Sequence, residues 1–215
     1  MLDIRYPSLG QTWLAAVEEV YRNGQGVADE TRELLGLCTA FQQADPATDP
    51  ILARFASQEC VREMRKVFFS AEPNLFGHCY GDKMQGPGGR RDLGDVIELL
   101  TRQPCSKRAV LTLVGNGDGR VPCINAIHFL RREDGLLATY FARGQDMFRK
   151  YYADAICIHE MARRVAVGLG VPLRRVSGVI SSAHVYVKDF DAIDAMLSDA
   201  RADRRPAMAL DGGTP

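Results

Sequence analysis

The sequence lacks an excess of charge of either sign, because Lys plus Arg and Asp plus Glu each number 27. A surface without a net positive field is poorly suited to the phosphate backbone of nucleic acid. Any anionic ligand must therefore be bound locally, by a few basic side chains that converge on it. We expect no nucleic acid partner.

Long apolar runs are absent as well. No stretch approaches the roughly 18 apolar residues that a membrane-spanning helix needs. Charges at Asp3 and Arg5 stand where a signal sequence would be apolar. These absences predict a cytoplasmic protein with no membrane partner.

The chain has 6 cysteines but no C-x-x-C pair. Thiols spread over a chain of this length favour the reduced form over a disulfide framework. Metal-binding patterns are incomplete: Arg163 occupies the second ligand position after His159-Glu160, and His78-Cys79 has no matching pair. No G-x-S-x-G segment suggests a serine hydrolase. We therefore expect neither a metal site nor a catalytic serine.

Helical and strand patterns alternate along the 215 residues, which are enough for one large domain. Apolar positions recur with helical spacing in several segments, and the first helix has Thr12 as its expected N-cap. The expected helices are 12–21, 51–69, 92–101 and a long helix that follows Asp146 and stops at Gly170; the expected strands are 108–114, 126–130, 136–141 and 176–187.

A predicted hairpin contains the first candidate site. Pro122-Cys123 opens its first strand, Asp134-Gly135 forms its turn, and Arg143 follows its second strand. Because antiparallel strands return to their starting point, Cys123 and Arg143 should lie close together. A guanidinium beside a thiol stabilises the thiolate and provides a binding site for an anion.

Other polar residues are notable for their positions. Arg22 begins an R-N-G-Q-G turn that suits a phosphate, although this segment alone favours a solvated helix end with a stabilising basic residue. Asp154 lies beside the apolar stripe of the long helix, where a carboxylate is unexpected; the alternative is a surface position in its first turns. The strand 176–187 presents His184 and Tyr186 on one side.

Taken together, these segments resemble the thymidylate synthase family, including its pyrimidine hydroxymethylase branch. The nucleophile of that family stands in a Pro-Cys pair, which Pro122-Cys123 matches. The phosphate motif Arg-Ser-x-Asp is matched from Arg143 to Asp146, with Gly144 in place of serine. The other matches are the turn at Arg22, the glutamate Glu63, the pair Tyr80-Gly81, the basic pair Lys107-Arg108, and His184-Val185-Tyr186. The resemblance covers most of the chain, from about residue 20 to residue 187.

The resemblance implies an α+β fold, with a mixed β-sheet flanked by helices and packed against a second copy at a homodimer interface. A single catalytic domain would span 1–190, and 191–215 would form a C-terminal helix and a frayed tail. The basic residues Lys107 and Arg108 would be shared across the interface. The implied partners are a pyrimidine nucleoside monophosphate and folate, with 5,10-methylenetetrahydrofolate as the cofactor.

The resemblance also implies a role for each matched residue. Cys123 would add to C6 of the pyrimidine, which makes C5 nucleophilic. Glu63 would handle proton transfers through ordered water, with Tyr80 in support. The nucleotide would be held by Arg22, Lys107, Arg108, Arg143, Asp146, His184 and Tyr186.

Position 154 distinguishes two bases within the family. Members that act on uracil have Asn there, whereas the cytosine-specific hydroxymethylases have Asp, as this chain does at Asp154. Cytosine presents an acceptor at N3 and a donor at N4, so a carboxyl can share a proton with N3 and accept from N4. We therefore expect Asp154 to act with Cys123, Glu63 and Tyr80 in the hydroxymethylation of CMP or dCMP.

Several departures from the family pattern leave two alternatives open. Ile124 follows the nucleophile where synthases usually have His, Gly144 replaces a phosphate-binding serine, and Ser182 stands where an aspartate is usual. One alternative is methylation of dUMP, for which Asp154 is the unfavourable residue. The other is a relative that binds nucleotide without catalysis, although binding alone does not require the nucleophile Cys123.

Overall fold

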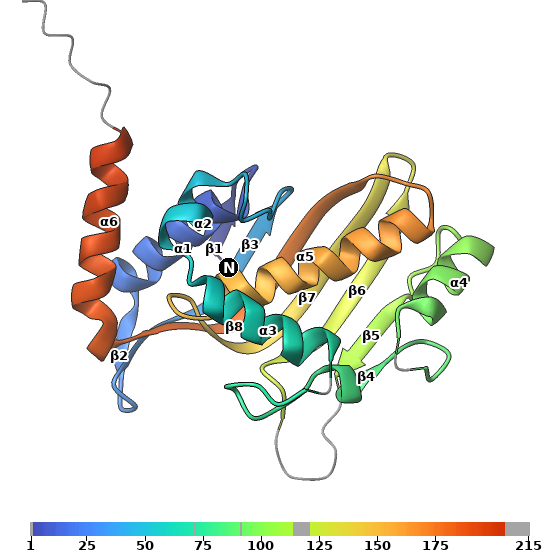
Figure 1. Ribbon diagram of the computed structural model, residues 1–215, viewed down its shortest axis with the longest axis horizontal. Helices are drawn as coiled ribbons and strands as arrows, with labels where there is room; N and C mark the ends of the chain where they lie inside the picture. Colours follow the sequence, from blue (N-terminus) through green and yellow to red (C-terminus); the bar gives the residue numbers. More distant parts are fainter. Residues whose placement is uncertain (1, 71, 91, 114–120, 205–215) are drawn as a thin grey trace, which may run out of the picture.

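The structure is a computed structural model, and it describes residues 2–70, 72–90, 92–113 and 121–204 (Figure 1). In chain order its elements are β1 (Leu2–Arg5), α1 (Leu9–Asn23), β2 (Gln25–Val27), β3 (Thr31–Phe41), α2 (Pro50–Phe55), α3 (Gln58–Phe69), η1 (Gly81–Lys83), β4 (Met84–Gln85), α4 (Gly94–Arg102), β5 (Val110–Leu113), β6 (Ile124–Arg132), β7 (Gly135–Asp146), α5 (Tyr151–Gly168), β8 (Leu173–Tyr186), η2 (Val187–Asp189) and α6 (Phe190–Arg204). The predicted tail beyond residue 204 lies outside the described residues, as does the last residue of the predicted strand 108–114.

The strands form one mixed sheet, which confirms the expected α+β architecture. It has 8 strands in the order β1-β3-β8-β7-β6-β5-β4, with β2 paired to β3. The β1–β3 and β7–β8 pairs are parallel, and the other pairs are antiparallel. Helix α5 connects the parallel strands β7 and β8, as a parallel pair requires.

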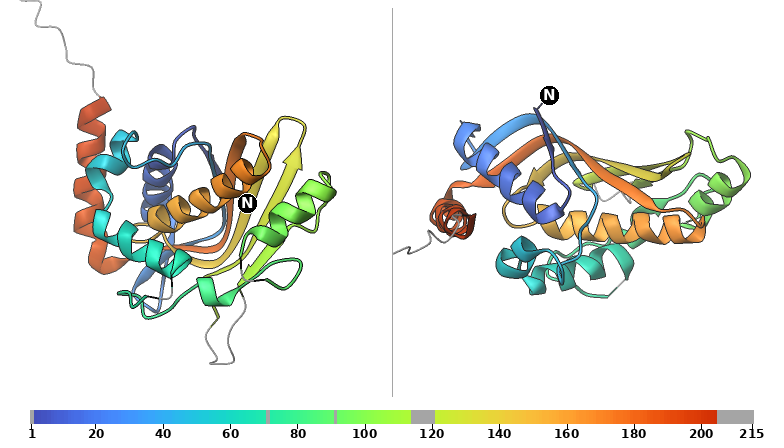
Figure 2. Two further views of the ribbon diagram at one scale, coloured as in Figure 1. Left: turned by 45° about the vertical axis from the view of Figure 1, so that its right-hand side comes forward. Right: turned by 90° about the horizontal axis from the view of Figure 1, so that it is seen from above.

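Helix α5 is the centre of the hydrophobic core. It contacts β7 and β8 on one side and α3 on another, and Figure 2 shows α5 and α3 on the same side of the sheet. Every residue from Tyr151 to Ile158 is consequently buried. The sequence predicted a single apolar stripe, but a helix enclosed between two layers buries its whole circumference. Any polar side chain in its first two turns is therefore removed from water.

Three details of the sequence-based prediction were wrong. The N-cap of α1 is Ser8, whose side chain accepts from the amide of Gln11, whereas Thr12 lies inside the helix. The predicted helix 51–69 is two helices, because Ala56 leaves the helical conformation and Ser57 caps a new helix. Strand β3, which pairs with both β1 and β8, was not predicted at all.

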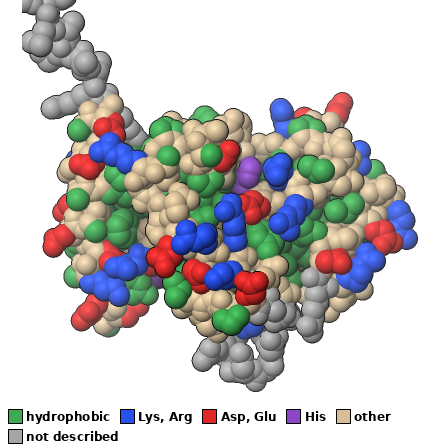
Figure 3. Space-filling view, viewed as in Figure 1, with side chains coloured by type: hydrophobic (Ala, Val, Ile, Leu, Met, Phe, Trp, Pro, Cys, Tyr) green, Lys and Arg blue, Asp and Glu red, His purple; other side chains and the backbone are tan. Residues whose placement is uncertain are grey.

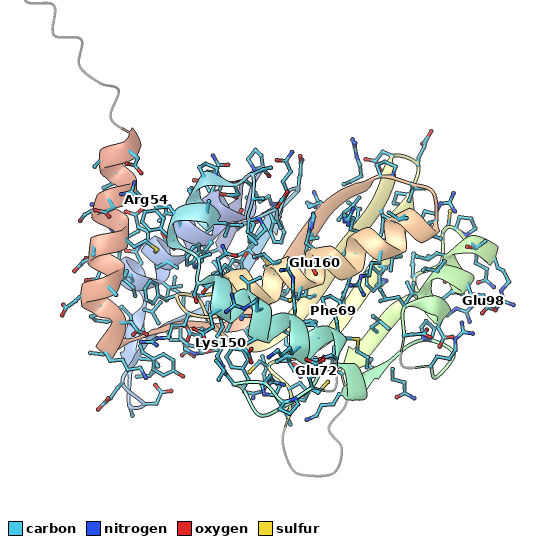
Figure 4. The ribbon with its side chains drawn as sticks, viewed as in Figure 1. Arg54, Phe69, Glu72, Glu98, Lys150 and Glu160 are labelled. Atoms are coloured by element: carbon cyan, nitrogen blue, oxygen red, sulfur yellow. The ribbon has the colours of Figure 1, made fainter. Side chains whose placement is uncertain are left out.

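Helix α6 packs against α1. Its buried residues Ile193 and Leu197 join the core, and the Tyr21 hydroxyl donates to Asp194 at 2.7 Å. Arg54 of α2 forms ion pairs with Asp199 and Asp203 of α6; Figure 4 shows Arg54 beside this helix. These contacts hold α6 against the rest of the fold. The described residues end with this helix, at Arg204.

Acidic and basic side chains are interspersed on the visible face of the molecule, in keeping with the balanced charge of the sequence (Figure 3). Among the helices that the structure describes, none is long and apolar enough to cross a membrane.

Candidate active site

The two ends of the predicted hairpin meet. The amide of Arg143 donates to the carbonyl oxygen of Cys123 at 2.9 Å, and Nη2 of Arg143 lies 3.9 Å from Sγ of Cys123. The pairing of β6 with β7 is irregular between Ile124 and Ala126, directly after the cysteine. Cys123 is exposed, so a ligand in solution can reach its sulfur.

The backbone around Cys123 also fixes the side chain of Arg143. Its Nε donates to the carbonyl oxygen of Pro122 at 3.1 Å, and Nη2 donates to that of Val121 at 2.9 Å. A guanidinium has about five N–H donors, so these bonds leave donors for an anion. The cation is therefore held beside the thiol before any ligand arrives.

Tyr80 connects the thiol to the buried part of the site. Its ring is 3% exposed and packs edge-on against Phe68 at 4.9 Å. Burial and the nearby charges of Asp154 and Cys123 raise the pKa of the Tyr80 hydroxyl, and the backbone of Ile124 and Cys123 offsets part of this rise. Tyr80 thus lies within electrostatic reach of both Cys123 and Asp154.

Asp154 is buried, which excludes the surface position that the sequence left open. It lies in the first turn of α5 and is 4% exposed. Burial raises the pKa of this carboxyl to about 7, against the lowering effects of Gln145 and Lys150. Nε2 of Gln145 donates to Oδ2 at 2.7 Å, while Oδ1 has no hydrogen-bond partner among the described residues.

Residues predicted to hold the sugar and the phosphate gather at the same end of the sheet. Asp146 pairs with His184 between β7 and β8, and the rings of His184 and Tyr186 form a T-shaped contact at 5.5 Å. Oδ1 of Asp146 accepts from the amides of Phe148 and Arg149. Burial raises the pKa of Asp146. Its carboxylate therefore shapes the turn that leads into α5.

Glu63 and Arg22, both predicted site residues, form local contacts instead. Oε1 of Glu63 accepts from Lys66 at 2.7 Å and Oε2 from the amide of Leu75 at 3.0 Å, and these bonds lower the pKa of Glu63. Arg22 forms an ion pair with Glu18 on the exposed surface of α1. Their roles in the site remain predictions.

The basic pair lies far from Cys123 within one chain. Arg108 donates to Gln103 and precedes β5. The register of β5 with β6 pairs Val110 with His128, so Arg108 is more than about 20 Å along the sheet from Cys123, at roughly 3.3 Å per residue. Within one chain this pair lies away from Cys123, and its role at a neighbouring subunit's site remains a prediction.

The sequence analysis missed two polar contacts near the site. Gln145 binds Asp154, but a glutamine inside a motif carries no titratable signal. Arg149 forms an ion pair with Asp189, whose side chain is 2% exposed; these residues are 40 positions apart in sequence. Only the register of β7 with β8 brings them together.

A cavity of about 530 Å³ lies at the start of α5. Residues from α1, α2, α3 and the turn before α5 line it. Lys150, labelled in Figure 4, lies over the ring of Phe76 with its Nζ 4.5 Å from the ring centroid. The lining includes five aromatic residues, Trp13, Phe55, Phe76, Phe148 and Tyr152, together with Glu59 and the cations Arg149 and Lys150. Such a cavity suits a flat ring that carries an anionic group.

Within the described ranges, no group of three or more His, Cys, Asp or Glu side chains could hold a metal ion. The polar groups of the site are those of a nucleophilic thiol, a cation and a buried carboxyl.

This arrangement is that of a thymidylate synthase-like fold. Over 89% of this chain and 84% of the other, the structure superposes on thymidylate synthase A from Bacillus subtilis with a TM-score of 0.65 and 13% identity. No family model matches the sequence.

Curated relatives with similar sequences cover nearly the whole chain, and three of them bear the name "Putative thymidylate synthase". The Methanosarcina mazei protein is 28% identical over 203 residues, which is 89% of this chain and 92% of that protein. The Methanosarcina barkeri protein is 27% identical over 202 residues, with the same coverage. The Methanocaldococcus jannaschii protein is 24% identical over 212 residues, 90% of this chain and 95% of that protein. Fold and sequence together support a thymidylate synthase-like protein.

Proposed function

We propose that this protein transfers a one-carbon unit to C5 of CMP or dCMP and produces the 5-hydroxymethyl nucleotide. The observation that carries the proposal is the buried carboxyl of Asp154, close enough to Tyr80 to raise its pKa, as is Cys123. A thiol and a cation alone would suit many acceptors. The buried carboxyl provides a group that can pair with the hydrogen-bonding edge of a pyrimidine.

Cys123 provides the nucleophile. Its thiolate sulfur forms a bond to C6 of the pyrimidine, and the electron pair of the C5–C6 double bond moves to C5, which becomes nucleophilic. Arg143, whose Nη2 lies 3.9 Å from the sulfur, donates to the 5′-phosphate. His184 and Tyr186 bind the sugar from the adjacent strand.

Asp154 reads the amino edge of the base. With its pKa near 7 the carboxyl is partly protonated at neutral pH, so it can donate to N3 of cytosine and accept from N4. Asn in its place would suit uracil. If the carboxyl proton stays on the oxygen that faces N3, uracil leaves buried polar groups unpaired, at a cost on the order of 1–3 kcal/mol each.

The aromatic cavity at the start of α5 fits a folate. Phe55, Phe76 and Phe148, which are partly exposed in its lining, offer faces for a pterin or aminobenzoyl ring, and Lys150 suits a glutamate carboxylate. When bound, 5,10-methylenetetrahydrofolate supplies the one-carbon unit. Glu63 and Tyr80 are proposed to guide protons at the base, and water is proposed to add the hydroxyl.

A homodimer would complete the phosphate site. Strand β7 turns Tyr140 towards the core and therefore Phe141 away from it; Phe141 is 42% exposed. Val179 pairs with Phe141, and Cys38 pairs with Val179 on the next strand, so partly exposed apolar side chains form a row across the sheet. We propose that a second copy covers this face, and that the partner subunit's Lys107 and the partner subunit's Arg108 reach the phosphate.

Methylation of dUMP is the second candidate, because the relatives bear the thymidylate synthase name. The two functions differ in both base and product. A protein that binds nucleotide without catalysis is the third possibility, and one experiment distinguishes all three.

Product mass after incubation with formaldehyde and tetrahydrofolate separates these functions. CMP and dCMP should gain a hydroxymethyl group, and UMP and dUMP should react poorly. Asp154→Asn should reverse the preference for the base, while Cys123→Ser, which leaves the fold intact, should give no product. A methyl group on dUMP would establish the alternative, and unchanged nucleotides with the wild-type protein would refute catalysis.

A further inference from the structure

Gln145 and Asp154 form a buried hydrogen-bonded pair, which indicates a role for Gln145 that the proposed function does not include. Gln145 is 3% exposed and Asp154 is 4% exposed, and Nε2 of Gln145 donates to Oδ2 of Asp154 at 2.7 Å. Two oxygens of the pair, Oε1 of Gln145 and Oδ1 of Asp154, have no partner anywhere in the part of the chain that the structure describes. Buried polar atoms in native proteins are normally satisfied, so these two oxygens indicate a polar ligand.

A neutral carboxyl alone does not discriminate cytosine from uracil. It can donate its O–H to cytosine N3 while the other oxygen accepts from N4, or donate to uracil O4 while the other oxygen accepts from N3–H. The two arrangements differ only in which oxygen carries the proton. Selection of one base therefore requires a group that makes the two oxygens different.

Gln145 supplies this asymmetry. A carboxyl oxygen that accepts from an amide N–H is the poorer site for the proton, so the hydrogen bond to Oδ2 favours the proton on Oδ1. The unpaired Oε1 beside it is a further acceptor, which suits an amino group and repels a carbonyl oxygen. Burial, which keeps part of the Asp154 population neutral near pH 7, makes the position of this proton relevant.

We propose that Gln145 is a positioning residue for base selection: it fixes the acidic proton of Asp154 on Oδ1, the oxygen that would face N3 of the bound base, so that the carboxyl pairs with cytosine and rejects uracil. This inference rests on the proposed cytosine-specific function. It adds a second residue, on a different element, to the recognition of the base.

Binding of CMP and UMP to the complete protein, measured by calorimetry, tests the inference without any need for turnover. Gln145→Met keeps the length of the side chain and removes its hydrogen bonds. The ratio of the UMP Kd to the CMP Kd should fall about tenfold towards one, while the Kd for ribose 5-phosphate stays unchanged. Gln58→Met makes the same chemical change at an exposed glutamine of α3 and should leave the ratio as in the wild type.

Gln145→Glu provides a conservative rescue. A protonated glutamate can donate to Oδ2 as the amide does. The preference of this variant for CMP, divided by that of the wild type at the same pH, should therefore recover as the pH falls. The other ionisable groups that interact electrostatically with Asp154 are Asp146, Lys150, Tyr80, Tyr140, Cys60 and Cys157. These groups are present in both the wild type and Gln145→Glu. Comparing the two proteins at the same pH therefore removes the effect of their titration.

Each outcome decides between the two claims. A wild-type preference for CMP that survives in Gln145→Met would overturn the role of Gln145 and leave the proposed function standing. Equal weakening of both nucleotides in Gln145→Met and in Gln145→Glu at every pH would show a structural role and also overturn it. A wild type that binds CMP and UMP equally would refute the cytosine selection itself, and the role of Gln145 with it.

Discussion

At the scale of single residues, the site depends on a carboxyl that is costly to ionise. Asp154 is surrounded by the core of α5, and its pKa of about 7 reflects burial more than any neighbouring charge. Gln145 offsets only part of that burial. A residue kept in such a position at the expense of stability is typical of a functional site.

The cost should appear in the pH dependence of unfolding. The pKa of Asp154 rises from 3.8 to about 7 on folding, so between these values the folded chain holds a proton that the unfolded chain has lost. Stability should therefore fall as the pH rises through this interval and level off above it. Thermal melting should show Asp154→Asn gaining Tm relative to the wild type at pH 8 and losing this advantage near pH 4. A constant difference across the range would contradict a buried, titrating carboxyl.

At the scale of elements, the turn between β7 and α5 positions both the carboxyl and the aromatic cavity. Arg149 in this turn pairs with the buried Asp189 of η2, and Asp146 accepts from two of the turn's amides. These bonds join the start of α5 to the end of β8. They hold the position of Asp154 relative to His184.

Removal of Arg149 should loosen this turn. Arg149→Ala leaves the Asp189 carboxylate buried without its partner, which should cost on the order of 1–3 kcal/mol of unfolding free energy, measured with urea. Arg102→Ala, at an exposed pair of α4, should change stability by less than about 1 kcal/mol. Equal effects of the two substitutions would show that the Arg149–Asp189 pair is not structural.

The hairpin was predictable because its signals are local. Asp134-Gly135 predicted the turn, which the structure places one residue earlier, at Glu133-Asp134 between the paired Arg132 and Gly135; strand pairing then brings Cys123 to Arg143. Strand β3 was not predictable in this way. Gly36, with a φ of 72°, interrupts the alternation of its side chains, and its pairing depends on β8, far along the chain. Gln145 was missed for a related reason: its partner on α5 is defined by packing, which no spacing in the sequence reveals.

At the scale of the whole molecule, one chain does not bring every predicted residue together. Lys107 and Arg108 lie far along the sheet from Cys123, and the sheet face with Phe141 is partly exposed. Both facts have one explanation if two copies pack through their sheets. The site then depends on the dimer.

Complementation tests this dependence. Cys123→Ala and Arg108→Ala should each be strongly impaired alone, yet mixing and refolding them together should restore roughly a quarter of the wild-type activity, because half of the dimers are then mixed and each has one intact site. Light scattering should show a dimer throughout. Inactive mixtures that are nevertheless dimeric would place the partner subunit's Arg108 outside the site.

The most direct test of the central claim is the release of tritium from C5 of labelled CMP and UMP in the presence of folate. Attack by the Cys123 sulfur at C6 and substitution at C5 must displace that hydrogen. The account predicts release from CMP that disappears in Cys123→Ala and is much slower from UMP. Release that survives in Cys123→Ala, or that is as fast from UMP, would contradict it.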